Sequence, residues 1–224
     1  MLFRSGGWQG QRDKTRVKDE PALTAERRAR IGWDNPVQDR LHVGWRVPSS
    51  VDDPKNAALG LLLKAYVFSD SSELWKQVVL DEQLAENVES WWSPHKDASL
   101  FAVAARVKDK KNPDDVLLRI QTQLDNLSAG KINDRRFTEV KSHLKYSLLM
   151  GLTSPSSISS ALAEYAGPAF DAGFVDGAYG ALEVVTPKDL QAFAQAHLQK
   201  SQRAVVVLHH DDAAASAAKK DGAK

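Results

Sequence analysis

Residues 71–107, SSELWKQVVL DEQLAENVES WWSPHKDASL FAVAARV, decide the fold of this chain. Their apolar spacing predicts a short amphipathic helix over Ser72–Leu80 and then a strand over Ala85–Ser93. A Pro-His-Lys-Asp turn at 94–97 returns the chain as a strand over Ser99–Val107. This second strand is mostly apolar at both alternating sets of positions, which predicts a central strand covered on both faces. The helix–strand junction carries no nucleophile and no metal-ligand cluster.

Helix-start and strand signals on either side of this stretch predict the remaining elements of the fold. Asp-Pro, Asn-Pro, Ser-Pro and Thr-Pro pairs mark helix starts, and alternating apolar residues mark strands. The other predicted strands are Glu26–Trp33, Arg40–Val47 and Arg203–Leu208, and the other predicted helices are Lys55–Phe68, 113–129, 133–151, Ser156–Ala166, Phe170–Leu182 and 187–197. Two hairpins and a closing strand separated by helices predict an α+β fold, with one mainly antiparallel sheet and helices packed on one face.

The chain divides into three parts. Residues 1–22 begin with Gly6-Gly7-Trp8 and continue as a charged, aperiodic stretch, which indicates the tail of a preceding element followed by a linker. Residues 23–210 hold all the periodic segments and form the predicted domain. Residues 211–224 are a low-complexity Ala/Lys tail, which we expect to be disordered.

Composition excludes several classes of protein. The 30 basic and 29 acidic residues nearly cancel, so no electrostatic footprint of a nucleic-acid binder is present. The sequence has no cysteine, which excludes disulfides and thiol catalysis. No apolar run approaches the roughly 20 residues of a membrane span, and the N-terminus lacks a signal peptide. The compartment stays open; a periplasmic location would follow if the chain derives from a longer exported bacterial parent.

Residue types that carry chemistry are dispersed along the chain. The six histidines show neither the His-Glu-x-x-His spacing nor its inversion. His209-His210-Asp211-Asp212 could chelate a metal, but adjacent strand residues point to opposite faces, which disfavours a single-ion site. Helix capping explains Ser156-Ser157 better than nucleophilic catalysis does. Lys141 and Lys145 are expected on a solvated helix face.

Six short segments stand in a characteristic order along the chain: Trp33-Asp34-Asn35-Pro36, 41–48 (LHVGWRVP), Leu74-Trp75-Lys76, 81–85 (DEQLA), 137–146 (FTEVKSHLKY) and 185–190 (VTPKDL). Through these segments the chain is similar to the C-terminal half-lobe of the insulinase/pitrilysin family of zinc peptidases. The resemblance extends over most of Trp33–Leu208, with Gly6-Gly7-Trp8 similar to the tail of a preceding half-lobe.

The resemblance implies a protein that encloses peptides in a chamber made by two bowl-shaped lobes, each built from two related α+β halves. The family's zinc motif, His-x-x-Glu-His, lies in the first half-lobe and is absent here, so zinc would sit on a partner domain and not on this chain. A later half-lobe supplies an Arg and, seven residues on, a Tyr that stabilise the oxyanion. Val79 and Glu86 occupy those two positions here, and neither side chain donates to an oxyanion.

The resemblance therefore implies a non-catalytic C-terminal domain of a zinc metallopeptidase, which completes the chamber and binds substrate. The implied partners are a zinc-bearing half-lobe, on the same parent chain or a separate subunit, and a peptide or unfolded protein. Glu86, Trp91 and Trp92 are the predicted substrate-binding residues, although core packing of the two tryptophans is an alternative. Two rival hypotheses remain: a non-proteolytic scaffold subunit of a processing-type complex, and a free-standing enzyme that uses His209 and His210.

Overall fold

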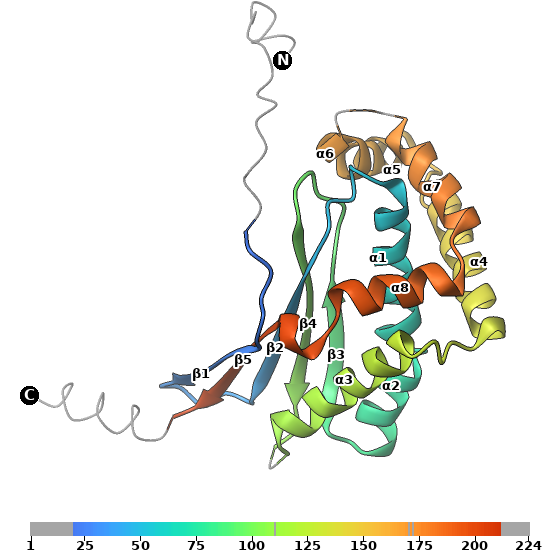
Figure 1. The fold of residues 1–224 in the computed structure, drawn as a ribbon. Helices are drawn as coiled ribbons and strands as arrows, with labels where there is room; N and C mark the ends of the chain where they lie inside the picture. Colours follow the sequence, from blue (N-terminus) through green and yellow to red (C-terminus); the bar gives the residue numbers. More distant parts are fainter. Residues whose placement is uncertain (1–19, 110, 170, 172, 212–224) are drawn as a thin grey trace, which may run out of the picture.

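The computed structural model describes residues 20–109, 111–169, 171 and 173–211 of the chain. Five strands form one sheet, with helices on one side of it (Figure 1). The strands are β1 (Arg27–Trp33), β2 (Arg40–Val47), β3 (Ala85–Trp91), β4 (Ser99–Val107) and β5 (Arg203–His210). The helices are α1 (Pro54–Val67), α2 (Glu73–Trp75), η1 (Lys76–Asp81), α3 (Pro113–Ser128), α4 (Asp134–Met150), α5 (Pro155–Ala161), η2 (Leu162–Ala166), α6 (Gly167–Ala169), α7 (Phe174–Val184), α8 (Pro187–His197) and η3 (Lys200–Gln202).

The sheet has the strand order β1-β5-β2-β4-β3. The pairs β2–β4, β2–β5 and β3–β4 are antiparallel and β1–β5 is parallel, so the predicted mainly antiparallel sheet with helices on one face is confirmed. The first two strands were expected to form a hairpin, and that is wrong because β5 lies between them. Val205 and Val207 of β5 are buried whereas all seven residues of β1 are exposed, so the apolar strand takes the inner position.

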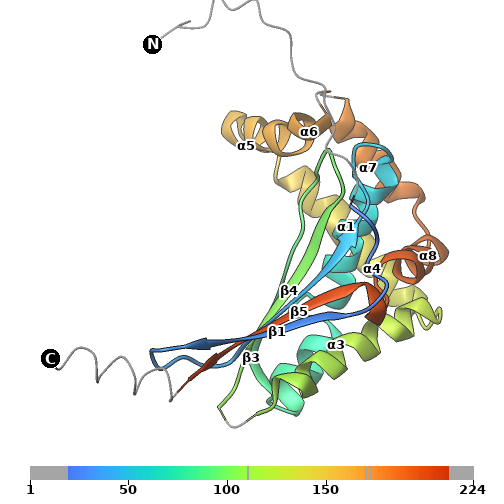
Figure 2. The same cartoon turned by 60° about the vertical axis from the view of Figure 1, so that its left-hand side comes forward.

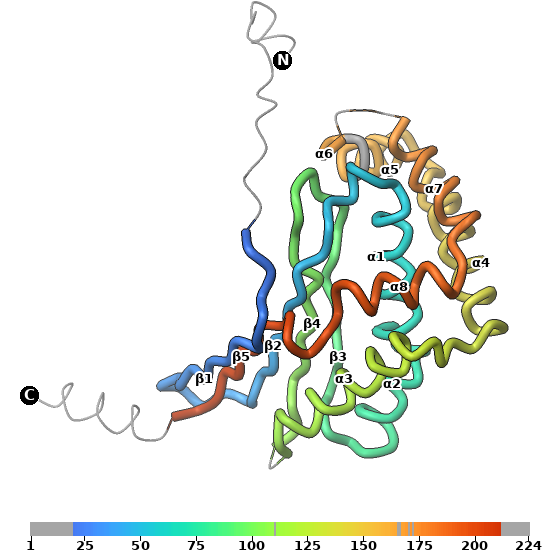
Figure 3. The backbone as a smooth tube through the Cα atoms, viewed as in Figure 1, coloured from blue at the N-terminus to red at the C-terminus, as the bar shows by residue number. Residues whose placement is uncertain are grey.

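The helices begin where the capping residues predicted. Asp53, Asn112, Asn133, Ser154 and Thr186 each accept a hydrogen bond from a backbone N–H of the first turn of the helix that follows. Helix α1 is apolar nearly all round and packs against α4, α7 and α8 in the centre of the helical layer (Figure 3). The predicted helix over Phe170–Leu182 starts later, at Phe174, and residues 170 and 172 lie outside the described part.

The core lies between the sheet and the helices. Leu41, Val43, Trp45, Phe101 and Val103 point from β2 and β4 into this layer and are at most 2% exposed. The opposite side of β4 was expected to be covered as well, and this is wrong: Leu100 is 62% exposed and Ala102 and Ala104 are only partly buried. Alternation of apolar residues on both sides of a strand does not reveal whether both sides are covered. Figure 2 shows the sheet with its helices behind and its other face open.

Candidate functional site

The open face of the sheet carries exposed apolar side chains. Register fixes its members, because residues paired across neighbouring strands share a face. On this basis the small and apolar residues of the open face are Trp91 of β3, Leu100, Ala102 and Ala104 of β4, Gly44 of β2, and Ala204, Val206 and Leu208 of β5. The same registers place polar and charged residues on this face, among them Arg40, His42, Arg46, Glu89 and Arg106. Its two largest apolar side chains, Trp91 and Leu100, are 48% and 62% exposed. Half-exposed apolar groups on one sheet face suit contact with another molecule.

The two predicted tryptophans lie in different surroundings. Trp91 pairs with Ala102 and belongs to the open face. Trp92 follows the end of β3 and packs in the helical layer, since a Cβ built on Gly60 of α1 would lie 2.5 Å from its indole ring. Its neighbours there include the buried Ala57, Phe174 and Ala178. Substrate binding by either residue stays a prediction, and only Trp91 is placed where a ligand on the open face would reach it.

Glu86, the third predicted binding residue, sits at a β-bulge near the start of β3. Its carboxylate accepts a hydrogen bond of 2.8 Å from the amide of Gln38 and forms an ion pair of 3.2 Å with Arg106. The hydrogen bond from Gln38, followed by that from Arg106, lowers the pKa of Glu86. The group is therefore a carboxylate at neutral pH that is already engaged by two neighbours.

Val79, at the position where the resemblance implies an arginine, lies in a π-helical turn. The expected amphipathic helix over Ser72–Leu80 is present, but it changes from α2 to the wider η1 at Lys76. Glu82 ends this turn and its two carboxylate oxygens each accept from Arg119 Nε at 3.0 Å, an arrangement that lowers the pKa of Glu82. Gln83 then takes a φ of 50°, and the chain enters β3. Val79 itself packs against the core.

A groove of about 450 Å³ opens at one end of the open face. The segment that precedes β1 forms one wall through residues 20–23, and Gly44, Leu100 and Ala204 form the floor. Arg46 donates to the carbonyl of Glu20 and holds this segment in place. His197 also lines the groove, and burial lowers its pKa, which favours the neutral imidazole at pH 7. This groove was not predicted, because the residues that line it are far apart along the chain.

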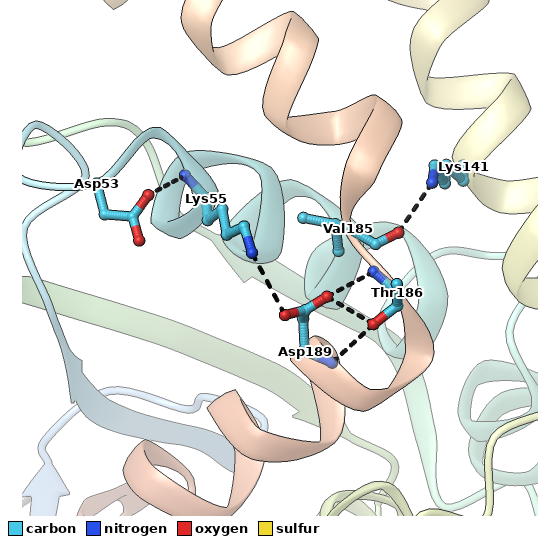
Figure 4. Close-up of polar contacts among 6 residues, drawn as sticks. All are labelled: Asp53, Lys55, Lys141, Val185, Thr186 and Asp189. Atoms are coloured by element: carbon cyan, nitrogen blue, oxygen red, sulfur yellow. Dashed lines mark hydrogen bonds and ion pairs between the residues drawn. The ribbon is translucent and has the colours of Figure 1, made fainter.

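Lys141 and Lys145 do not form the solvated face that was expected of them. Lys141 Nζ donates to the carbonyl of Glu183 at 2.6 Å and to that of Val185 at 2.8 Å, where α7 ends. Figure 4 shows the contact with Val185. Lys145 pairs with the Glu183 carboxylate at 2.5 Å. Burial lowers the pKa of Lys141, with the charge of Lys145 as the next cause. Lys141 therefore satisfies the open carbonyls of a helix C-terminus and Lys145 pairs with a side chain of the same turn, so both lysines are structural.

The VTPKDL segment is also structural. Thr186 and Asp189 form a capping box at the start of α8: each side chain accepts from the backbone N–H of the other residue. Lys55 Nζ lies 3.6 Å from the Asp189 carboxylate and joins the start of α1 to this box (Figure 4).

Asp189 predicts a pH dependence of stability. Hydrogen bonds from the hydroxyl and the backbone N–H of Thr186 lower its pKa. The carboxylate therefore stabilises the fold above its unfolded pKa, near 3.8, and this stability is lost as pH falls through the lower folded pKa. Asp189→Ala should cost about 1 kcal/mol at pH 7 and less at pH 2.5, measured by urea unfolding. Asp70→Ala, at an exposed turn, is the control; equal losses for Asp189→Ala at both pH values would contradict this prediction.

The described residues do not fit a zinc site. His209 and His210 are adjacent on β5. His209 Nδ1 lies 2.9 Å from the carbonyl oxygen of His210, and His210 Nδ1 lies 3.1 Å from the carbonyl oxygens of Trp33 and Asn35. Nowhere in the described part do three His, Cys, Asp or Glu side chains gather as metal ligands would. Ser157 completes a capping box with Ser154, as capping predicted.

The fold defines the class of protein: an α+β half-lobe with a five-stranded sheet, helices on one side and an open apolar face on the other. The family model described as the Peptidase M16 inactive domain matches residues 4–144. The match spans more than half of the chain, so the chain belongs to this family, and the resemblance to a zinc-peptidase half-lobe that lacks the catalytic motif is confirmed. No curated protein matches the chain.

Solved structures share the fold. A protease from Helicobacter pylori matches with a TM-score of 0.80 and 22% identity, over 89% of this chain and 48% of its own. The inactive peptidase domain of a candidate zinc protease from Bordetella parapertussis matches with a TM-score of 0.66 and 18% identity, over 79% of this chain and 95% of its own. A chain of complex III2 from Candida albicans matches with a TM-score of 0.65 and 15% identity, over 84% of this chain and 46% of its own. This chain thus spans about half the length of the Helicobacter protease.

Proposed function

We propose that this chain is the non-catalytic half of a zinc peptidase. It completes a peptide-enclosing chamber and contacts the substrate, while a zinc-bearing half-lobe, on the same parent chain or a separate subunit, performs the cleavage. The observation that carries this proposal is the open apolar face of the sheet, because such a face suits contact with an extended peptide or a partner domain. In the described part, no helix has the length and apolar character that crossing a bilayer requires.

The experiment combines the chain with a zinc-bearing half-lobe of the same family. Cleavage of a quenched fluorescent peptide and zinc content by mass spectrometry are measured for each half alone and for the mixture. We expect zinc to accompany the other half-lobe and cleavage to require both halves. Stoichiometric zinc on this chain together with peptide hydrolysis by it alone would overturn the proposal.

Leu100→Glu should disable the open face without unfolding the domain. Leu100 is 62% exposed, so the fold tolerates the charge, but a peptide on the open face would meet a carboxylate in place of an apolar contact. Loss of one leucine contact is worth about 1.5 kcal/mol, or roughly tenfold in the kcat/KM of the assembled enzyme. Leu118→Glu, on α3 and 56% exposed, is the matched control. Equal effects of the two variants would show that the open face has no part in cleavage.

A scaffold role is the second candidate, and the likeness of fold to a chain of complex III2 favours it. In this case the chain would hold an assembly together without serving proteolysis. Deleting the chain would then disrupt the assembly and leave peptidase activity unchanged, whereas the first proposal expects cleavage to be lost. Size-exclusion chromatography and peptide cleavage on the same cell extract separate the two outcomes.

A further inference from the structure

Strand β1 forms one outer edge of the sheet and pairs only with β5 among the described residues. The pairing runs without a bulge from Arg27 to Trp33, and all seven residues are exposed. Figures 1 and 2 show β1 and the end of β5 extending beyond the helical layer. The result is a regular strand of ordinary length at the outer edge of the sheet.

Backbone direction determines which residues face outward. The Trp33 carbonyl accepts from the N–H of Asp211 at 3.0 Å, so Trp33 directs its backbone groups toward the β5 side. The N–H and C=O of one strand residue point to the same edge, and successive residues alternate. Arg28, Arg30 and Gly32 therefore direct their backbone donors and acceptors to the free edge. A guest strand would bond to these three residues.

The side chains of β1 divide by chemistry. On the side of the helices, Arg28 forms an ion pair with Asp114 of α3, while Arg30 has no ion-pair partner among the described residues. On the open side, Ile31 is 48% and Trp33 is 51% exposed. The side toward the helices therefore carries the arginines Arg28 and Arg30, whereas the open side is apolar from Ala29 to Trp33 and has a cation, Arg27, only at its start.

We propose that the free edge of β1 binds an extended segment of a partner protein in which acidic and apolar residues alternate. The main chain of the guest would bond to Arg28, Arg30 and Gly32. Its acidic side chains would lie beside Arg30, and its apolar side chains beside Ile31 and Trp33. Cross-strand pairs of opposite charge and of apolar groups favour this orientation. The proposal stands apart from the chamber role, which concerns the open face of the sheet and not its edge.

The competing explanation is that the arginines keep the edge from pairing at all, since charged residues often protect edge strands. The other protective devices are missing from this edge: β1 is not short, contains no proline and has no bulge. Ile31 and Trp33 would also be a liability on a strand designed to stay unpaired. Our proposal expects an acidic strand to bind this edge, whereas protection of the edge expects no strand to bind.

The experiment uses the full chain and capped, fluorescein-labelled peptides. Val-Glu-Val-Glu-Val-Glu is the probe, Val-Lys-Val-Lys-Val-Lys reverses its charge, and a version of the probe N-methylated at alternate residues removes its edge donors. Fluorescence anisotropy should give a Kd about tenfold tighter for the glutamate peptide than for the lysine peptide, the effect of one favourable charge-assisted pairing of about 1.4 kcal/mol. N-methylation should abolish binding.

The variant that tests the site is Arg30→Glu, and Arg135→Glu, an exposed arginine of α4, is its matched control. Arg30→Glu should weaken binding of the glutamate peptide about tenfold and reverse the preference in favour of the lysine peptide, while Arg135→Glu should change neither. Four outcomes would each overturn the proposal: equal binding of both peptides, no binding of either peptide, binding that survives N-methylation, or an Arg30→Glu variant that binds as the unmodified chain does.

Discussion

Glu26→Gln should lower the free energy of unfolding by about 3 kcal/mol. The reason is the environment of Arg203, which is only 4% exposed at the start of β5. Its Nε donates to the Glu26 carboxylate at 2.6 Å and its Nη1 donates to Gln121 of α3 at 2.7 Å. Removing the charge of Glu26 leaves a buried guanidinium with only a neutral acceptor, and that costs more than the ion pair itself contributes.

Chemical denaturation followed by tryptophan fluorescence measures this loss. Glu139→Gln is the control, because Glu139 forms an exposed i,i+4 pair with Arg135 that is worth no more than about 0.5 kcal/mol. The double variant Glu26→Gln with Arg203→Met should recover part of the loss, since the stranded charge is gone. If Glu26→Gln and Glu139→Gln were equally mild, the network around Arg203 would not be a stabilising feature.

Gly60→Ala should destabilise the domain by about 2 kcal/mol, although alanine is the better helix former. Gly60 is buried in the middle of α1, and a Cβ there would lie 2.5 Å from the indole of Trp92. Accommodating a methyl group needs a shift of a packed ring, and overpacking of this kind costs more than the propensity gained.

Gly180→Ala is the matched control, because a Cβ on this glycine of α7 meets nothing within 4 Å. It should stabilise the fold by about 0.5 to 1 kcal/mol through helix propensity alone. Combining Gly60→Ala with Trp92→Leu should restore part of the loss by making space for the methyl group. Opposite signs for the two glycines in thermal unfolding are the expected result, and a stabilised Gly60→Ala variant would contradict the packing of Trp92.

The candidate site was only partly predictable. Glu86 and Trp91 were predicted as substrate-binding residues, and both are exposed on β3, while their role in substrate binding stays a prediction. Leu100 escaped notice because an apolar residue on a strand gives no sign of whether its side is covered. Lys141 was misjudged because its acceptors, the carbonyls of Glu183 and Val185, are about forty residues away in the sequence.

The sequence by itself determined the elements of this protein, since period-two and helical spacing and the capping pairs at Asp53-Pro54 and Thr186-Pro187 are local signals. It also carried the family, through short segments whose order matches a zinc-peptidase half-lobe. Only the tertiary structure decided that β5 inserts between β1 and β2, that one face of the sheet stays open and that β1 offers a free edge. These features depend on contacts between residues far apart in the chain. Several elements are apolar enough to be buried, and no local pattern shows which of them takes an inner position in the sheet or is covered by helices.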